Sequence, residues 1–147
     1  MELAGIIIAA LSLLATAVTY IVDKSLERKQ RTLEKLNELR NDYHESVAGK
    51  ERKHEKDYYR NCVKLFGNVE QFCAGVLSRY YSFGVVKKNG SRFICMLFSD
   101  FKEYLIDQRR RMYPDENYYQ NLEKLVNKLK KDKYKRDYQN NPKKRIN

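Results

Sequence analysis

The chain has 147 residues and a formal net charge of +11, with 30 Lys and Arg against 19 Asp and Glu. Its two histidines and three cysteines form no HExxH motif and no paired-cysteine metal site, and no GxSxG elbow or phosphate-binding glycine loop occurs. The composition therefore predicts no metal, no cofactor and no catalytic residue.

An uncharged run of 20 residues, 3–22, opens the chain. At ~1.5 Å per residue this run forms a helix about 30 Å long, which matches the hydrocarbon thickness of a bilayer. We predict a transmembrane span over residues 1–22 that acts as an uncleaved signal anchor. The alternative is a secretory signal cleaved near the "ATA" of residues 15–17. A buried soluble helix is disfavoured because the run has no polar face.

The charge distribution predicts the orientation of this span. All 30 Lys and Arg follow residue 22, and four of them crowd one end of the span: Lys24, Arg28, Lys29 and Arg31. The positive-inside rule then places the N-terminus outside and the C-terminal region in the cytoplasm of a single-pass membrane protein. Three cysteines without paired spacing fit a reducing compartment.

The span sorts its residues onto two faces. Small residues recur at steps of three and four: Gly5, Ala9, Ser12, Thr16 and Thr19. Bulky residues follow the same steps two positions later: Ile7, Leu11, Leu14, Val18 and Ile21. Two positions are about 200° of helix rotation, so the stripes lie on opposite sides. We expect the small stripe to form an oligomer interface, or to face a lumen in a ring of copies, and the bulky stripe to face lipid. Alternatively, the small residues are simply tolerated in a span.

Helical periodicity continues beyond the membrane. An apolar series over residues 22–47 runs at steps of four and three, with Lys29 and Arg40 at two of its positions: Val22, Leu26, Leu33, Leu36, Tyr43 and Val47. We predict a juxtamembrane stalk helix over residues 23–48, a poor isolated coiled coil because of the two charged seam positions. The charged run 50–56 is the expected break.

A helical bundle over residues 55–138 is predicted to follow. Its first helix runs from 58 to about 81 with a regular apolar stripe: Tyr59, Cys62, Phe66, Val69, Cys73, Val76 and Tyr80. The "KKNGS" of residues 87–91 predicts a turn, with Ser91 as a helix N-cap. The next helix is expected to bury Phe93, Ile94, Leu97, Phe101, Tyr104 and Leu105, and a last one, begun near Pro114, to bury Tyr118, Leu122, Leu125, Val126 and Leu129. The fold class is all-α.

The C-terminal region is strongly basic. From residue 128 onward there are two acids and nine cations: Lys128, Lys130, Lys131, Lys133, Lys135, Arg136, Lys143, Lys144 and Arg145. Residues 139–147, which include the last three of these cations, form a basic tail. A solvated helix end explains this run without any partner. A patch for anionic lipid, nucleic acid or a nucleoprotein complex is the functional alternative.

Two weak patterns invite an enzymatic hypothesis. Asp100, Glu103 and Asp107 share one side of a predicted helix, but a solvated face is the more ordinary explanation for such carboxylates. Small helical bundles that cut RNA often carry an Arg five to seven positions before a His. Arg40 precedes His44 by only four positions, one short of that pattern. We therefore expect no enzyme, and a divergent helical RNase is the third-ranked hypothesis.

Two groups of proteins resemble the chain. The stretch "NVEQFCAGVLSRYYSFGVV" (68–86) through "FKEYLIDQRRRMYPDENYYQNLEKL" (101–125) is similar to uncharacterised single-span bacterial membrane proteins with helical cytosolic tails. The order of span, stalk and basic bundle resembles the membrane accessory proteins of type VI-B CRISPR loci. That second resemblance implies an oligomeric membrane pore in antiviral defence.

Two functions of different class thus follow. The first is a self-associating inner-membrane protein, in its strongest form a pore or accessory effector of CRISPR-type defence. The second is a membrane-tethered basic module that binds nucleic acid or an acidic protein. The first depends on the sorted faces of the span, and the second depends on the basic C-terminal region.

Overall fold

The computed structural model describes residues 2–48, 55–111 and 118–140, with side chains described for 5–48, 56–111 and 118–133. Described residues are almost all helical and include no strand, which confirms the all-α prediction. In chain order the elements are α1 (Glu2–Ser46), α2 (Glu55–Leu77), α3 (Phe83–Val85), a π-helical segment (Val86–Gly90), α4 (Ser91–Asp100), α5 (Lys102–Arg111) and α6 (Gln120–Asn140).

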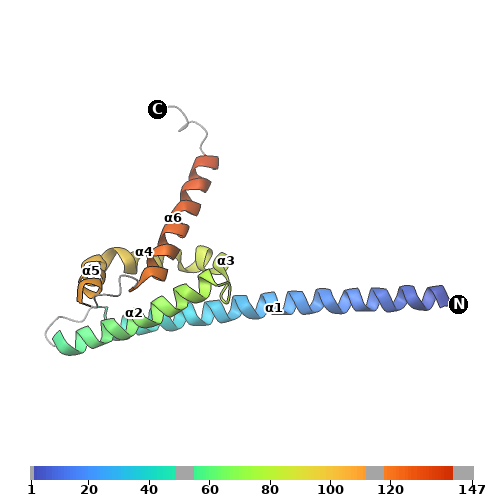
Figure 1. Ribbon diagram of the computed structural model, residues 1–147, viewed down its shortest axis with the longest axis horizontal. Coiled ribbons are helices and arrows are strands. Elements are labelled where there is room, and N and C mark those ends of the chain that lie inside the picture. Colours follow the sequence, from blue (N-terminus) through green and yellow to red (C-terminus); the bar gives the residue numbers. More distant parts are fainter. Residues whose placement is uncertain (1, 49–54, 112–117, 141–147) are drawn as a thin grey trace.

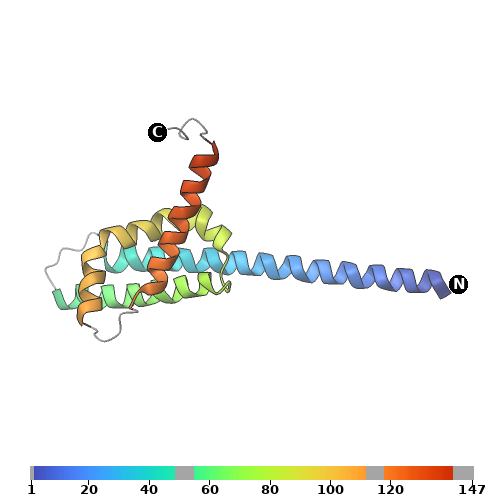
Figure 2. The same cartoon turned by 45° about the horizontal axis from the view of Figure 1, so that its top comes forward.

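Helix α1 is a single unbroken helix of 45 residues, about 67 Å long at 1.5 Å per residue. Its first half projects away from the rest of the molecule, and its second half lies beside α2 (Figures 1 and 2). The helix expected to continue out of the apolar run is therefore present, and its second half is one of the packed helices of the bundle.

The face that α1 buries differs from the predicted series. Leu36 and Val47 are buried as expected, but Leu26 and Leu33 are 56% and 40% exposed. Thr32 and Leu39, which the series omitted, are fully buried. The buried face differs because the predicted series continues the apolar periodicity straight from residue 22, whereas α1 is covered by other elements only from about residue 32 onward.

Helix α2 ends four residues earlier than expected, at Leu77, and the chain turns back over residues 78–82. The amide of Tyr81 donates to the carbonyl of Gly75 across this turn, at 3.1 Å. Arg79 adopts a left-handed backbone conformation with φ 67°. Tyr80, predicted to lie on the buried stripe, is 55% exposed as a result.

The predicted turn at residues 87–91 is also wrong, because helical backbone continues from Phe83 to Asp100. Gly90 lies against α1, where an added Cβ would come within 2.8 Å of a Leu36 methyl. The glycine therefore permits close helix packing rather than a reversal. Ser82, not Ser91, accepts the capping hydrogen bond, from the amide of Val85.

The expected third helix is divided by Phe101, whose backbone leaves the helical conformation between α4 and α5. Helix α5 then runs across the direction of α4 (Figure 2). The last predicted helix begins at Gln120, so Tyr118 precedes it, while Pro114 lies outside the described residues.

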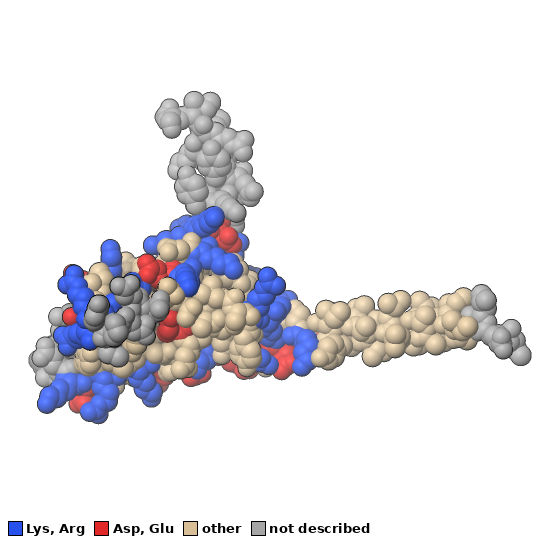
Figure 3. All heavy atoms as spheres, in the orientation of Figure 1, with Lys and Arg blue, Asp and Glu red and all other residues tan. Residues whose placement is uncertain are grey.

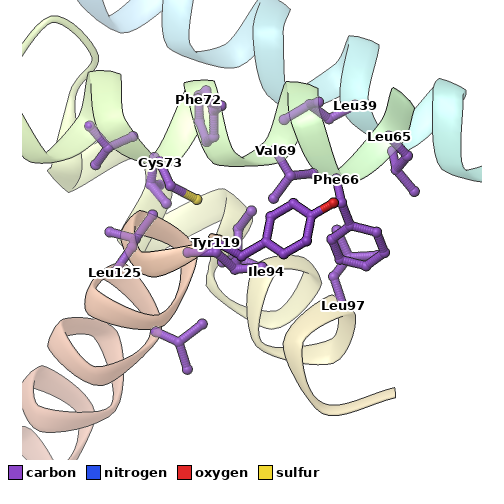
Figure 4. Close-up of a cluster of buried hydrophobic side chains, with 14 of the residues drawn as sticks. Leu39, Leu65, Phe66, Val69, Phe72, Cys73, Ile94, Leu97, Tyr119 and Leu125 are labelled. Atoms are coloured by element: carbon purple, nitrogen blue, oxygen red, sulfur yellow. The ribbon is translucent and has the colours of Figure 1, made fainter. Parts of the chain in front are cut away.

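One hydrophobic core joins α1, α2, α4, α5 and α6. Figure 4 shows the parts of this core that come from α1, α2, α4 and the start of α6. Phe66 of α2 is fully buried and contacts the rings of Phe101, Tyr104 and Tyr119 at centroid distances of 5.1–5.8 Å. Cys62 and Cys73 lie in the same core as free thiols. Aromatic contacts at these distances hold the later helices to α2.

A buried threonine connects α1 to the turn that follows α2. The Thr32 hydroxyl donates to the Arg28 carbonyl at 2.6 Å and accepts the amide proton of Ser82 at 2.8 Å. Buried polar groups cost free energy unless they are hydrogen-bonded, and this hydroxyl satisfies itself and a backbone amide at once. The 78–82 turn is thereby fixed against one turn of α1.

Gly90→Ala should lower the free energy of unfolding by about 1–3 kcal/mol, because the new methyl group overpacks against Leu36. Gly67→Ala is the matched control, since an added Cβ there meets no atom within 4 Å. It should stabilise α2 by about 0.5–1 kcal/mol through helix propensity. Thermal unfolding of the full chain in detergent measures both. Equal effects of the two substitutions would contradict the close contact.

Thr32→Val should leave the Ser82 amide without an acceptor and cost about 1–3 kcal/mol. Thr32→Ser keeps the hydroxyl and serves as the control for lost packing. Hydrogen exchange at the Ser82 amide separates the two effects. Protection should persist in Thr32→Ser and disappear in Thr32→Val, and slow exchange in both variants would refute the hydrogen bond.

Candidate membrane-spanning face and basic groove

The first half of α1 is one helix long and apolar enough to cross a membrane, and no residue from 5 to 24 is buried within the molecule. Figure 3 shows this half as an uncharged rod that ends where charged residues begin. Such a length of exposed apolar surface is unstable in water, so it must be covered by lipid or by other helices.

Both stripes of the span are exposed along their length. On the small stripe the three hydroxyls donate to the carbonyl four residues earlier, each at 2.9 Å: Ser12 to Ile8, Thr16 to Ser12, and Thr19 to Ala15. On the opposite stripe the side chains are 52–66% exposed: Ile7, Leu11, Leu14, Val18 and Ile21. Because the hydroxyl protons are already bonded, the small stripe tolerates an apolar environment without water.

A basic groove of about 990 Å³ lies between α4 and α6. Lys130 and Lys133 line it from α6, as the predicted basic patch required. Lys87 and Arg92, which the predicted basic patch did not include, line it from the opposite side. Four cations from two segments that are 40 residues apart in the chain thus share one concave surface.

Part of the predicted basic patch is occupied by contacts within the bundle. The Lys128 ammonium lies 4.5 Å from the centre of the Phe83 ring, and Lys130 lies 5.9 Å from that of Phe98. Lys131 is exposed. The side chains of Lys135 and Arg136, and all of Lys143, Lys144 and Arg145, lie outside the part of the chain that the structure describes.

One thiol faces this groove. Cys95 is partly exposed there, and burial raises its pKa, while Lys130 and Lys133 act in the opposite direction. Burial also raises the pKa of Cys62, and it does so strongly for Cys73 in the core. The three thiols therefore differ in access: Cys62 and Cys73 are buried, whereas Cys95 borders the basic groove.

Arg40 and His44, the two residues considered for RNA cleavage, lie one turn apart on α1. The Arg40 guanidinium donates to the carbonyl of Asn89 and lies 5.8 Å from the centre of the Phe93 ring. His44 is exposed, with its ring against Tyr43. Arg40 therefore holds the π-helical segment onto α1.

The three carboxylates considered for a metal ion are divided between two helices. Asp100 ends α4, whereas Glu103 and Asp107 lie on α5 beyond the break at Phe101. Asp107 pairs with Arg111 at 2.7 Å. Among the described residues no group of three or more metal-ligating side chains lies close enough to hold an ion.

These features define a class: an all-helical protein with one candidate membrane-spanning helix and a small basic bundle. Residues 2–129 match the family described as Domain of unknown function (DUF4760), and the chain belongs to that family. The match includes the apolar half of α1 as well as the bundle. Neither the curated proteins nor the solved structures contain a significant match.

A thiol-alkylating reagent at pH 8 should modify Cys95 well before Cys62 and Cys73, because only Cys95 borders the groove and a buried thiol ionises poorly. Peptide mass mapping after timed exposure of the native protein measures the three rates. Alkylation of Cys73 as fast as Cys95 in the folded protein would contradict the core described above.

Proposed function

We propose that this protein is a single-pass membrane protein that self-associates through the small stripe of its span and holds its helical bundle on the cytoplasmic side. The observation that supports the proposal best is the continuity of α1, which joins an exposed apolar rod to a packed bundle helix without a break. The cations from Lys24 onward favour the cytoplasmic placement of the bundle.

Helix continuity also supports retention of the span. The "ATA" segment considered as a cleavage site lies within the helical span, and α1 remains helical for about thirty residues beyond it. Signal peptidases require an accessible small-residue site after a short apolar run. Here the apolar run continues to Val22, past the small-residue site, which is less typical of a cleaved signal.

The position of the bundle around α1 supports association through the small stripe. At about 100° per residue, the mean direction of the small stripe lies about 160° from that of the face that α1 packs into the bundle, formed by the buried Thr32, Leu36, Leu39 and Val47 and the partly buried Tyr43. The bundle therefore lies on the side of α1 opposite the small stripe. Neighbouring spans can approach through Gly5 and Ala9 without a collision of their bundles, which point outward.

The internal hydrogen bonds of Ser12, Thr16 and Thr19 favour a dry helix cluster as the resting arrangement. Close backbone approach at small residues is the usual basis of such association in lipid. A pore in antiviral defence is the extended form of this proposal, and it requires that the same hydroxyls turn toward a wet lumen.

Ala9→Leu should dissociate the assembly, because a leucine side chain prevents backbones from approaching on the small stripe. Ala10→Leu adds the same bulk about 140° from the mean direction of that stripe and should leave the assembly intact. Light scattering of the detergent-solubilised full chain measures the mass of wild type and both variants. A monomeric wild type, or equal loss of mass in both variants, would refute association through this face.

A second candidate function, binding of nucleic acid by the tethered bundle, is supported by the excess of cations in the α4–α6 groove. Asp100 also lines this groove, and Lys87 is paired with Asp132 at 2.9 Å, so Arg92, Lys130 and Lys133 are the candidate ligands. The alkylation rate of Cys95 measures this binding, because single-stranded RNA bound in the groove would shield the thiol. An unchanged alkylation rate in excess RNA at low salt would count against this candidate.

A further inference from the structure

A second basic groove, which the sequence did not predict, lies where the span meets the bundle. It encloses about 550 Å³ and is built from two segments: Tyr20, Lys24, Arg28 and Arg31 of α1, with Arg79 and Tyr80 of the 78–82 turn. Figure 3 shows cations gathered at this junction, directly beyond the uncharged rod. The bundle thus brings Arg79 back beside a helix segment some fifty residues earlier in the chain.

The groove has an excess of three positive charges, since four cations and a single acid, Glu27, line it. Glu27 is already engaged by Lys24 at 3.3 Å and Arg31 at 2.7 Å. The hydrogen bond from Lys24 and the charges of both cations lower the pKa of Glu27. Within the described residues, the guanidinium groups of Arg28 and Arg79 make no ion pair. Two cations are therefore available for an external anion.

Arg79 is held at the groove in an unfavourable backbone conformation. Its φ of 67° is one that a residue with a Cβ rarely adopts, and glycine would relieve the strain. The turn is anchored through the Ser82 amide on Thr32, and the Tyr80 ring lies beneath the Arg31 guanidinium at 4.8 Å. A left-handed residue is common where a helix ends, and here this helix stop places Arg79 at the groove.

The position of the groove along α1 indicates what it binds. Lys24 and Arg28 lie about 3 and 9 Å beyond Val22, the last uncharged residue of the span, and Tyr20 lies just inside it. The headgroup layer of a bilayer is about 5–8 Å thick on each side of the hydrocarbon. If α1 spans the membrane as proposed above, the groove opens at the level of lipid phosphates.

We propose that this groove binds the headgroup phosphate of an anionic phospholipid, with Arg28 and Arg79 as its direct ligands. Guanidinium groups form paired hydrogen bonds with phosphate oxygens, and Tyr20 and Tyr80 supply the amphipathic rings that suit the membrane interface. The bound lipid links the span to the bundle, since its two ligands come from α1 and from the 78–82 turn. This inference rests on the proposed membrane insertion.

The test uses the full chain in detergent micelles, titrated with short-chain phosphatidylglycerol or phosphatidylcholine, and native mass spectrometry counts the lipids retained. Wild type should retain phosphatidylglycerol in preference to phosphatidylcholine. Arg79→Gln should weaken that binding about tenfold, as expected for loss of a charge-assisted hydrogen bond. Arg110→Gln, at an exposed arginine of α5 away from the groove, makes the same change of charge and should have no effect.

Arg79→Gly separates binding from folding. It should raise the melting temperature by relieving the left-handed strain and weaken phosphatidylglycerol binding as much as Arg79→Gln does. A variant that is more stable yet binds less lipid cannot be explained by misfolding. Equal retention of both lipids by wild type, or equal effects of Arg79→Gln and Arg110→Gln, would overturn the proposal.

Two further measurements distinguish the sources of failure. Displacement of phosphatidylglycerol by millimolar inorganic phosphate would indicate a site for the free anion and would overturn the assignment to lipid. Resistance to alkaline carbonate extraction from phosphatidylcholine vesicles tests insertion alone. A protein that resists extraction but shows no preference for phosphatidylglycerol refutes the lipid site and leaves the membrane function standing, whereas an extracted protein refutes the membrane function itself.

Discussion

The structure depends on one constraint, the continuity of α1 through two different environments. Because the helix has no break between Glu2 and Ser46, a rotation of the span about its axis rotates the bundle equally. The directions of the small stripe, the bulky stripe and the bundle are therefore coupled through about 100° per residue. The bulky stripe and the buried face of the bundle helix point the same way. If α1 spans a membrane as proposed, the bundle therefore overhangs the lipid around the bulky stripe.

Thr32 fixes the position of the turn after α2 relative to α1. It is the first buried residue of α1 and one of two buried polar side chains in the described residues. Its hydroxyl fixes the turn after α2, and the close approach of Gly90 to Leu36 fixes the π-helical segment one helical turn further along. The packing of the bundle on α1 thus begins at a hydrogen bond, and apolar contacts follow.

The sequence predicted what periodicity alone determines. The helical class, the long first helix and most of the buried stripe of α2 follow from the spacing of apolar residues. The errors fall where tertiary contacts override local signals. Asn89 and Gly90 resemble a turn, but the glycine serves helix packing, and Tyr80 continues an apolar series that the chain leaves at Leu77. Periodicity also gave no sign of Arg79 or Lys87, because each reaches its groove only after the chain folds back.

The proposed self-association and the proposed lipid site occupy different sectors of α1 and are compatible. The small stripe lies about 95° around the helix from the mean direction of Tyr20, Lys24, Arg28 and Arg31. Spans that pack through Gly5 and Ala9 therefore leave the juxtamembrane groove open to the surrounding bilayer, beneath the overhanging bundle. A lipid held there is a second contact between bundle and membrane, beside the helix itself. Two contacts at different positions around the helix axis restrain the tilt of α1, whereas the span alone leaves this tilt free.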